Sequence, residues 1–316
     1  MIQTDPYASR FEAEPRIVRR RDPVLYEPEP GAPDSVLSDR WARFFEEKGY
    51  LSFQSVFSRD EVAELSDELE RLRADPRLRD APQVVAEPES REARSIFEVH
   101  ALNSVFHRLS RDARMVGVVR RILGSPVYIH QSRVNYKPGF EGREFYWHSD
   151  FETWHMEDGM PRMRAVSCSV SLTENNDFNG PLMLVPGSHK LYVTCVGETP
   201  KEHYKQSLRK QEYGVPSRDA LRALVDRGGI VAAKGPPGSV TFFDCNIMHG
   251  SAGNMTPWPR SNVFFVYNSV ENALVAPFCG LAPRAEYIAA RASAAPVEAL
   301  STPRRPETRS AGSLRF

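Results

Sequence analysis

The sequence predicts a mainly β protein with flanking helices, built around a double-stranded β-helix, the two-sheet jelly roll. The pattern changes at Pro126. Apolar residues recur at helical spacing before it, and short apolar or alternating runs follow it. Gly, Pro and Asn separate these runs, as in Pro236-Pro237-Gly238, which is typical of turns between short strands. Strands are expected over residues 127–137, 165–173, 182–185, 230–233, 239–243 and 262–269.

Three helices are expected before the jelly roll. Trp41 and Phe45 recur at helical spacing before Gly49, which ends the first helix. A third helix is expected over about 103–123. Ser58 is a typical N-cap for the second helix, whose apolar stripe consists of Val62, Leu65, Leu69 and Leu72.

We expect residues 37–299 to form a single domain, with helices over about 37–124 and the jelly-roll core over about 126–270. Residues 1–36 are rich in Pro, Arg and Glu and lack a period, so they are expected to be an extended N-terminal segment. The other irregular stretches are expected to be two loops and a loose C-terminal tail, over residues 76–95, 197–216 and 300–316.

The composition argues against several classes of function. Lys+Arg and Asp+Glu are equal at 41 each, so no basic field favours nucleic acid. No apolar run approaches the roughly 20 residues that cross a bilayer, and the polar N-terminus argues against a signal peptide. We therefore expect a cytoplasmic protein with no nucleic-acid or membrane partner. Its cysteines are scattered and expected to be reduced thiols: Cys168, Cys195, Cys245 and Cys279.

The triplet His148-Ser149-Asp150, together with His249 and Arg260, carries the strongest chemical signal in the chain. A strand turns alternate side chains to one face, so extended backbone would point His148 and Asp150 at one atom. Two histidines and one carboxylate occupy one face of a six-coordinate metal, which suits non-haem Fe(II) that binds O2 and a co-substrate together. His249 is the expected third ligand. The guanidinium of Arg260 could hold the far carboxylate of 2-oxoglutarate bidentately.

Other interpretations of these residues stay open at this point. A lone His-x-Asp triplet usually binds nothing, and the later His-x10-Arg spacing is what favours a metal site. A zinc hydrolase is a further option, but zinc sites usually have a nearby carboxylate base and no distant arginine. A non-catalytic metal-binding jelly roll is disfavoured, because retaining a metal needs no co-substrate clamp of the kind that Arg260 and Lys137 suggest.

A polar face follows the first predicted strand toward the metal ligands. Such a face is often solvated, but a strand that leads to iron ligands favours a cavity wall. There Lys137 could add a charge-assisted bond to a 2-oxoglutarate oxygen, and Gln131 offers both a donor and an acceptor to a small zwitterion. The side chains that share this face are Gln131, Arg133, Asn135 and Lys137.

One run of residues resembles a known family. Residues 146–161 read YWHSDFETWHMEDGMP and are similar to the signature of ectoine hydroxylases, a branch of the phytanoyl-CoA dioxygenase-like Fe(II)/2-oxoglutarate oxygenases. The resemblance covers roughly residues 5–290. It departs at Ala8, where the family's N-terminal motif has proline. It extends to Asp5-Pro6-Tyr7, Asp22-Pro23-Val24, Arg164-Ala165-Val166-Ser167, Asn179-Gly180-Pro181-Leu182 and Pro186-Gly187-Ser188-His189-Lys190.

The resemblance implies a cupin-like core, a homodimer and the hydroxylation of ectoine to 5-hydroxyectoine, with 2-oxoglutarate converted to succinate and CO2. No catalytic residue is implied beyond the metal centre. The iron ligands implied are His148, Asp150 and His249. The residues implied for the two organic ligands are Lys137, Arg260 and Ser251 for 2-oxoglutarate, and Gln131, Thr153 and Trp154 for ectoine.

Ectoine carries a carboxylate and a cationic amidine, so its cavity needs a donor for the first and aromatic faces or an acceptor for the second. Trp154 suits the aromatic role, with core packing as the alternative. Asn262 and Phe264 share the face of Arg260 by the strand period and are expected to reach the same cavity. The triad does not select the substrate, so another small amino-acid-like substrate remains the alternative. Three neighbours are expected to be supporting residues rather than catalysts, namely His155, Glu157 and Asp158.

Overall fold

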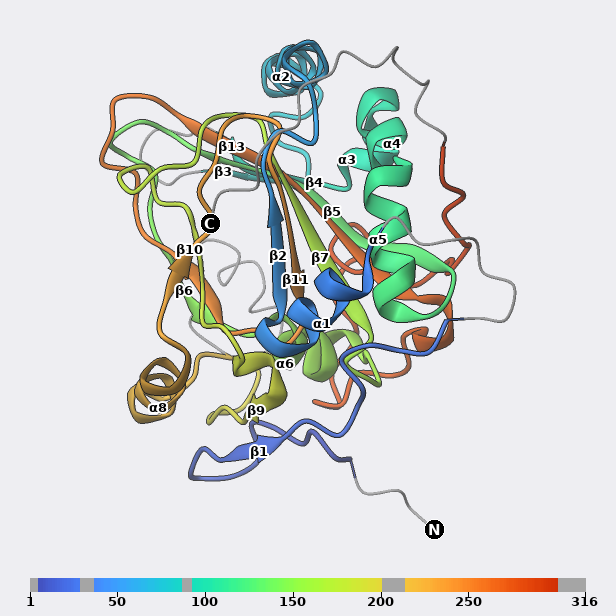
Figure 1. The fold of residues 1–316 in the computed structure, drawn as a ribbon, viewed down its shortest axis with the longest axis vertical. Helices are drawn as coiled ribbons and strands as arrows, with labels where there is room; N and C mark the ends of the chain where they lie inside the picture. Colours follow the sequence, from blue (N-terminus) through green and yellow to red (C-terminus); the bar gives the residue numbers. More distant parts are fainter. Residues whose placement is uncertain (1–4, 29–36, 87–92, 201–213, 301–316) are drawn as a thin grey trace.

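The computed structural model describes residues 5–28, 37–86, 93–200 and 214–300, and its ribbon is shown in Figure 1. Strands dominate this part of the chain and form a seven-stranded, a four-stranded and a two-stranded sheet. All paired strands of the large sheet are antiparallel, in the order β2-β11-β7-β13-β5-β4-β3. Its strands are β2 (Tyr50–Phe53), β3 (Val84–Ala86), β4 (Ala93–Phe97), β5 (Val127–Lys137), β7 (Ala165–Ser171), β11 (Val240–Asp244) and β13 (Arg260–Ser269).

The four-stranded sheet has the order β10-β8-β12-β6, and the two-stranded sheet pairs β1 with β9. These sheets confirm the mainly β architecture that the sequence predicts, and each of the six predicted stretches contains a strand. The strands of the smaller sheets are β6 (Phe145–His148), β8 (Leu182–Leu184), β10 (Val231–Ala232), β12 (His249–Ser251), β1 (Ile17–Arg19) and β9 (Leu191–Val193).

The helices begin and end at local signals in the sequence. Ser58 caps α2 with a capping box, because its hydroxyl accepts from the Glu61 amide while the Glu61 carboxylate accepts from the Ser58 amide. Gly49 ends α1 in the left-handed conformation, with φ of 82°. The helices are α1 (Asp39–Lys48), α2 (Arg59–Ala74), α3 (Val99–Leu102), α4 (Ser104–Ser110), α5 (Ala113–Leu123), α6 (Asp150–Thr153) and α8 (Arg218–Gly228), with short turns η1 (Trp154–Asp158), η2 (Ser188–Lys190) and η3 (Val270–Asn272).

Two predictions for the helical region are wrong in part. The expected loop over 76–95 contains β3 and the first residues of β4. The expected helix over 103–123 is divided into α4 and α5, because the Asp112 carboxylate accepts from the Arg114 amide and starts a new helix. An aspartate that bonds the backbone in this way competes with helix continuation.

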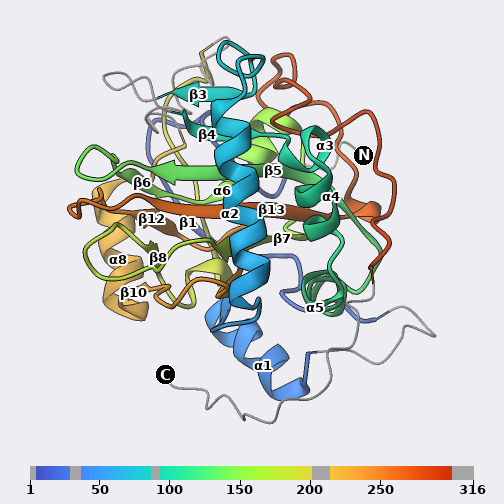
Figure 2. The same ribbon diagram turned by 90° about the horizontal axis from the view of Figure 1, so that it is seen from above.

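Alternation along β7 separates the two faces of the large sheet. Val166, Cys168 and Val170 join the main hydrophobic cluster, which also contains the apolar stripe of α2 and the inner face of α5. Figure 2 shows α2 lying across the strands of this sheet. By the two-residue period Ser167 and Ser169 point to the opposite face. The helices therefore cover one face of the large sheet, and its polar face is turned toward the four-stranded sheet.

The N-terminal segment contributes to this second layer. β1 pairs with β9, and the side chains of Tyr7 and Arg10 are only 1% and 4% exposed. The four cysteines are free thiols, as expected, and three of them are buried. Within the described ranges no helix is long and apolar enough to cross a membrane. The expected C-terminal tail lies outside the described residues except for Leu300, as does most of the expected loop over 197–216.

Candidate active site

Strand pairing in the four-stranded sheet brings the three predicted metal ligands together. His148 is the last residue of β6, and His249 is the first residue of β12 and lies directly opposite it in the antiparallel register. Ser149 keeps an extended backbone, with φ of −105° and ψ of 127°, and Asp150 then begins α6. The two-residue spacing therefore turns His148 and Asp150 toward the same point, as the sequence predicts.

The three side chains present ligand atoms that all lie within 4.8 Å of one another. Nε2 of His148 is 3.7 Å from Oδ1 of Asp150, and Nε2 of His249 is 3.8 Å from Oδ2. The other ring nitrogen of each histidine faces a carbonyl oxygen, that of Tyr146 at 2.7 Å and that of Ile247 at 3.0 Å. A carbonyl can only accept, so each Nδ1 carries the proton, and each Nε2 keeps a lone pair for a cation shared with the carboxylate.

The electrostatics of this cluster suit a cation. Burial, together with the neighbouring His249, lowers the pKa of His148 to about 4, so its ring is neutral at neutral pH. A neutral imidazole is the form that binds a metal. Ser167 donates to Asp150 at 3.4 Å and orients the carboxylate. Two histidines and one aspartate form the donor set of the facial triad that binds non-haem Fe(II).

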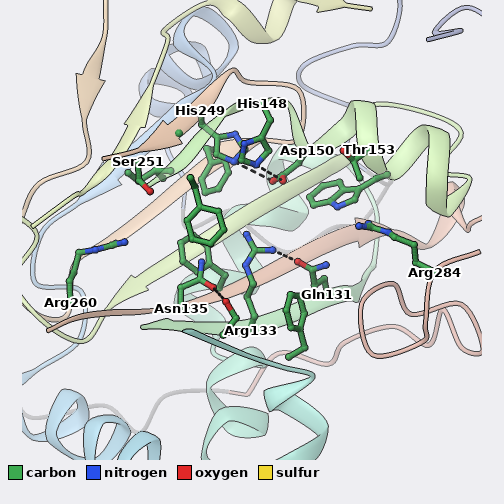
Figure 3. Close-up of a pocket in the computed structure, with 18 residues that line it drawn as sticks. Gln131, Arg133, Asn135, His148, Asp150, Thr153, His249, Ser251, Arg260 and Arg284 are labelled. Atoms are coloured by element: carbon green, nitrogen blue, oxygen red, sulfur yellow. Dashed lines mark hydrogen bonds and ion pairs between the residues drawn. The ribbon is translucent and has the colours of Figure 1, made fainter. Parts of the chain in front are cut away.

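A cavity opens from these ligands between the two sheets, and Figure 3 shows its lining. Arg260 and Arg284 enter from opposite sides with their guanidinium groups toward the centre, and Arg133 lies between them. Nine of the eleven residues predicted from the sequence line this cavity, namely His148, Asp150, His249, Ser251, Arg260, Gln131, Thr153, Trp154 and Phe264.

Lys137 and Asn262 were also predicted to reach the cavity, but the structure places both just behind its wall. The Lys137 ammonium donates to the Ser251 hydroxyl at 2.9 Å and also to the Ala252 carbonyl. The Asn262 amide, with its oxygen turned toward Arg260, accepts from that guanidinium at 3.0 Å. Each side chain therefore supports a residue that lines the cavity.

The Arg260 end of the cavity has a buried guanidinium that is incompletely hydrogen-bonded. Arg260 is 4% exposed, and burial lowers its pKa to about 10. Among the described residues its Nε has no hydrogen-bond partner. A buried guanidinium of this kind is stabilised by a carboxylate that accepts two parallel hydrogen bonds from one of its edges.

The opposite end is aromatic and polar. Trp154 is 3% exposed and packs edge-on against His130, with ring centroids 5.1 Å apart. Gln131 donates through Nε2 to the Ile288 carbonyl at 2.7 Å, and its Oε1 accepts from Arg133. The hydroxyl oxygen of Thr153 is buried without a hydrogen-bond partner in the described part of the chain. These groups leave polar atoms available beside an indole face.

Several cavity residues were missed by the sequence reasoning. Arg284 belongs to none of the motifs quoted for the family resemblance, yet it lines the cavity, and its guanidinium bonds Asp158 through two nitrogens. Burial by itself would raise the pKa of Asp158, but the charge and hydrogen bonds of Arg284 outweigh it and lower the pKa to about 2. Ser95 and Phe97 come from β4, whose first residues fall in the expected loop over 76–95, and Phe243 comes from β11. Only the strand pairing of β4 with β5 could have revealed its contribution.

A jelly-roll cavity with two histidines and one aspartate at its metal position defines the class of non-haem iron oxygenases. The chain belongs to the phytanoyl-CoA dioxygenase family: residues 45–262 match the family described as "Phytanoyl-CoA dioxygenase (PhyH)". The predicted cupin-like fold class is thereby confirmed.

Relatives that are about half identical in sequence match nearly the whole chain. The protein named "Ectoine dioxygenase" from Bordetella bronchiseptica is 56% identical over 287 residues, which are 91% of this chain and 92% of that protein. The protein of the same name from Stutzerimonas stutzeri is 52% identical over 297 residues, which are 94% of this chain and 98% of that protein. A crystal structure of EctD from S. alaskensis with 2-oxoglutarate and 5-hydroxyectoine matches with a TM-score of 0.85 and 50% identity, covering 95% of this chain and 99% of that one. The same enzyme with bound Fe matches with a TM-score of 0.84.

Proposed function

We propose that this chain is an Fe(II)- and 2-oxoglutarate-dependent dioxygenase that hydroxylates ectoine to 5-hydroxyectoine and releases succinate and CO2. The observation that carries the proposal is one cavity that joins three metal-ligand side chains to a buried guanidinium whose Nε has no partner among the described residues. The identity of the substrate rests on the reaction named for relatives that are similar over most of the chain.

At the metal end of the cavity, different residues bind the iron and the 2-oxoglutarate. His148, Asp150 and His249 hold Fe(II) through two imidazole nitrogens and a carboxylate oxygen. When bound there, iron supplies the dioxygen activation that couples decarboxylation of 2-oxoglutarate to hydroxylation. Arg260 binds the far carboxylate of 2-oxoglutarate, and the Ser251 hydroxyl adds a second bond. Lys137 fixes the orientation of Ser251 by donating to its hydroxyl, which directs the hydroxyl hydrogen away from the ammonium and toward the co-substrate.

The other end of the cavity binds the substrate. Arg284 pairs with the ectoine carboxylate, while the indole of Trp154 faces the cationic amidine. Thr153 and Gln131 provide hydrogen-bonding atoms beside them. Holding the two charged ends of the ring fixes which C–H group faces the metal. This positioning is the protein's main contribution to selectivity.

Succinate formation by the purified protein tests the proposal. With Fe(II) and 2-oxoglutarate present, addition of ectoine should stimulate succinate release strongly and produce hydroxyectoine, and His249→Ala should abolish both. If another small amino-acid-like compound stimulates turnover and ectoine does not, the alternative oxygenase is correct. If no compound releases succinate while the metal is bound, the non-catalytic metal-binding protein is correct.

We further propose a homodimer that works in the cytoplasm, with residues 37–299 as a single catalytic domain. The free cysteine thiols are consistent with a reducing compartment, and the dimer follows from the family resemblance. Light scattering of the purified protein tests the oligomeric state, and a mass of one chain would contradict it.

A further inference from the structure

A chain of buried charges leads away from the substrate end of the cavity and begins at Arg284. Its Nε donates to Oδ1 of Asp158 at 2.7 Å, and its Nη2 donates to Oδ2 at 2.6 Å. This fork occupies one edge of the guanidinium. Within the part of the chain that the structure describes, Nη1 makes no hydrogen bond, and the guanidinium points into the cavity (Figure 3).

This network of buried charges continues to the N-terminal segment. Nε of Arg284 lies 3.8 Å from Oε2 of Glu157, whose other oxygen accepts from Nη1 of Arg10 at 2.7 Å. Arg10 also forms a fork with Glu152, at 2.9 and 2.7 Å. All of these side chains are at most 7% exposed. Opposite charges inside a protein attract strongly because water screens them little.

The placement of this charge network connects it with the substrate end of the cavity rather than with the metal end. Glu157 and Asp158 lie on η1, the same turn that carries Trp154 into the cavity. Arg10 and Arg284 both lie outside the residues 45–262 that match the family as a whole. The metal ligands lie inside that range. The charge network therefore joins carboxylates that lie inside the matched range to two arginines that lie outside it.

We propose that Asp158 is a positioning residue for ectoine: it grips the Nε–Nη2 edge of Arg284 so that Nη1 faces the substrate carboxylate. The inference rests on the proposed function. A free arginine side chain has several rotatable bonds, and the fork removes that freedom before the substrate arrives. Glu157, itself held by Arg10, keeps the guanidinium from turning away from Asp158.

The test compares Asp158→Asn with Asp177→Asn, which makes the same change in an exposed ion pair with Lys234. The amide of Asp158→Asn can accept only one bond from the guanidinium, so the half-saturating concentration of ectoine should rise about tenfold. That of 2-oxoglutarate should stay unchanged in both variants. The ring compound that lacks the carboxylate, 2-methyl-1,4,5,6-tetrahydropyrimidine, should react equally poorly with wild type and Asp158→Asn.

A double-mutant cycle with Arg284→Ala separates positioning from a general structural effect. In the Arg284→Ala background, Asp158→Asn should add nothing to the ectoine requirement, because there is no guanidinium left to position. Additive effects, or an equal loss with the decarboxylated compound, would overturn the proposal. If Asp158→Asn does not fold, Glu157→Gln provides the same comparison with a milder change, and an unaltered ectoine requirement in that variant likewise overturns the proposal.

The visible absorption of the Fe(II)–2-oxoglutarate complex reports whether each variant assembles the metal end. Retained absorption together with weaker ectoine use supports the positioning role. A wild type that binds both ligands but does not hydroxylate ectoine would refute the proposed function. A wild type that hydroxylates ectoine, with Asp158→Asn unchanged, would refute the positioning role alone.

Discussion

Arg260→Ala removes the buried guanidinium at the co-substrate end of the cavity. Burial lowers the pKa of Arg260 from its ordinary 12.5 to about 10. At about 1.4 kcal/mol for each pH unit, this difference corresponds to about 3 kcal/mol of desolvation that a bound carboxylate offsets. Truncation of one partner in a buried charge pair costs about 2–5 kcal/mol, the same order. The half-saturating concentration of 2-oxoglutarate should therefore rise about a hundredfold.

The assay measures the rate of succinate formation against 2-oxoglutarate concentration, with Fe(II) and ectoine saturating. Arg16→Ala is the matched control, because the Arg16 side chain is 55% exposed and forms a surface ion pair with Glu12. The ectoine requirement of Arg260→Ala should remain close to that of the wild type. An unchanged 2-oxoglutarate requirement would refute the reasoning, and Lys137 behind Ser251 would then be the better candidate for the carboxylate partner.

Two further predictions concern the aromatic wall and a buried histidine. Trp154→Ala should raise the half-saturating concentration of ectoine, because a cation–π attraction of about 0.5–2 kcal/mol is lost. The variant should also form succinate without an equal amount of hydroxyectoine. Equal amounts of the two products at a normal ectoine requirement would make Trp154 a core residue. Burial lowers the pKa of His189 from 6.5 to about 4, so the unfolded chain binds that proton more tightly and up to about 3 kcal/mol of stability is lost as the pH falls from 6.5 to 4. His189→Gln should lose less over this window in denaturant titrations at each pH, and an identical pH dependence would contradict this.

The clustering of the predicted metal ligands follows largely from a local signal. The spacing of His148 and Asp150 needs only one strand end, and the period of β5 places Gln131 and the cavity on one face. The same period assigned Lys137 to the cavity, but its long side chain turns to the Ala252 carbonyl at the end of the strand. Periodicity fixes the face of a residue and not the direction of a flexible side chain.

The remaining parts of the cavity depend on contacts between distant segments. β4 was missed because its buried residues include Arg94 and Ser95, so apolar alternation is hidden. Arg284 reaches the cavity from a segment without a strand or helix, held there by a carboxylate more than a hundred residues earlier. A pattern within one window of sequence contains no information on such a pairing, which arises only when the fold brings the segments together.

The central claim is that this cavity couples 2-oxoglutarate decarboxylation to hydroxylation of ectoine. Turnover under dioxygen labelled with the heavy isotope of oxygen tests it most directly, with both products analysed by mass spectrometry. The account predicts one labelled oxygen atom in hydroxyectoine and one in succinate, in equal amounts. Label in succinate alone, at the same rate with and without ectoine, would contradict the account.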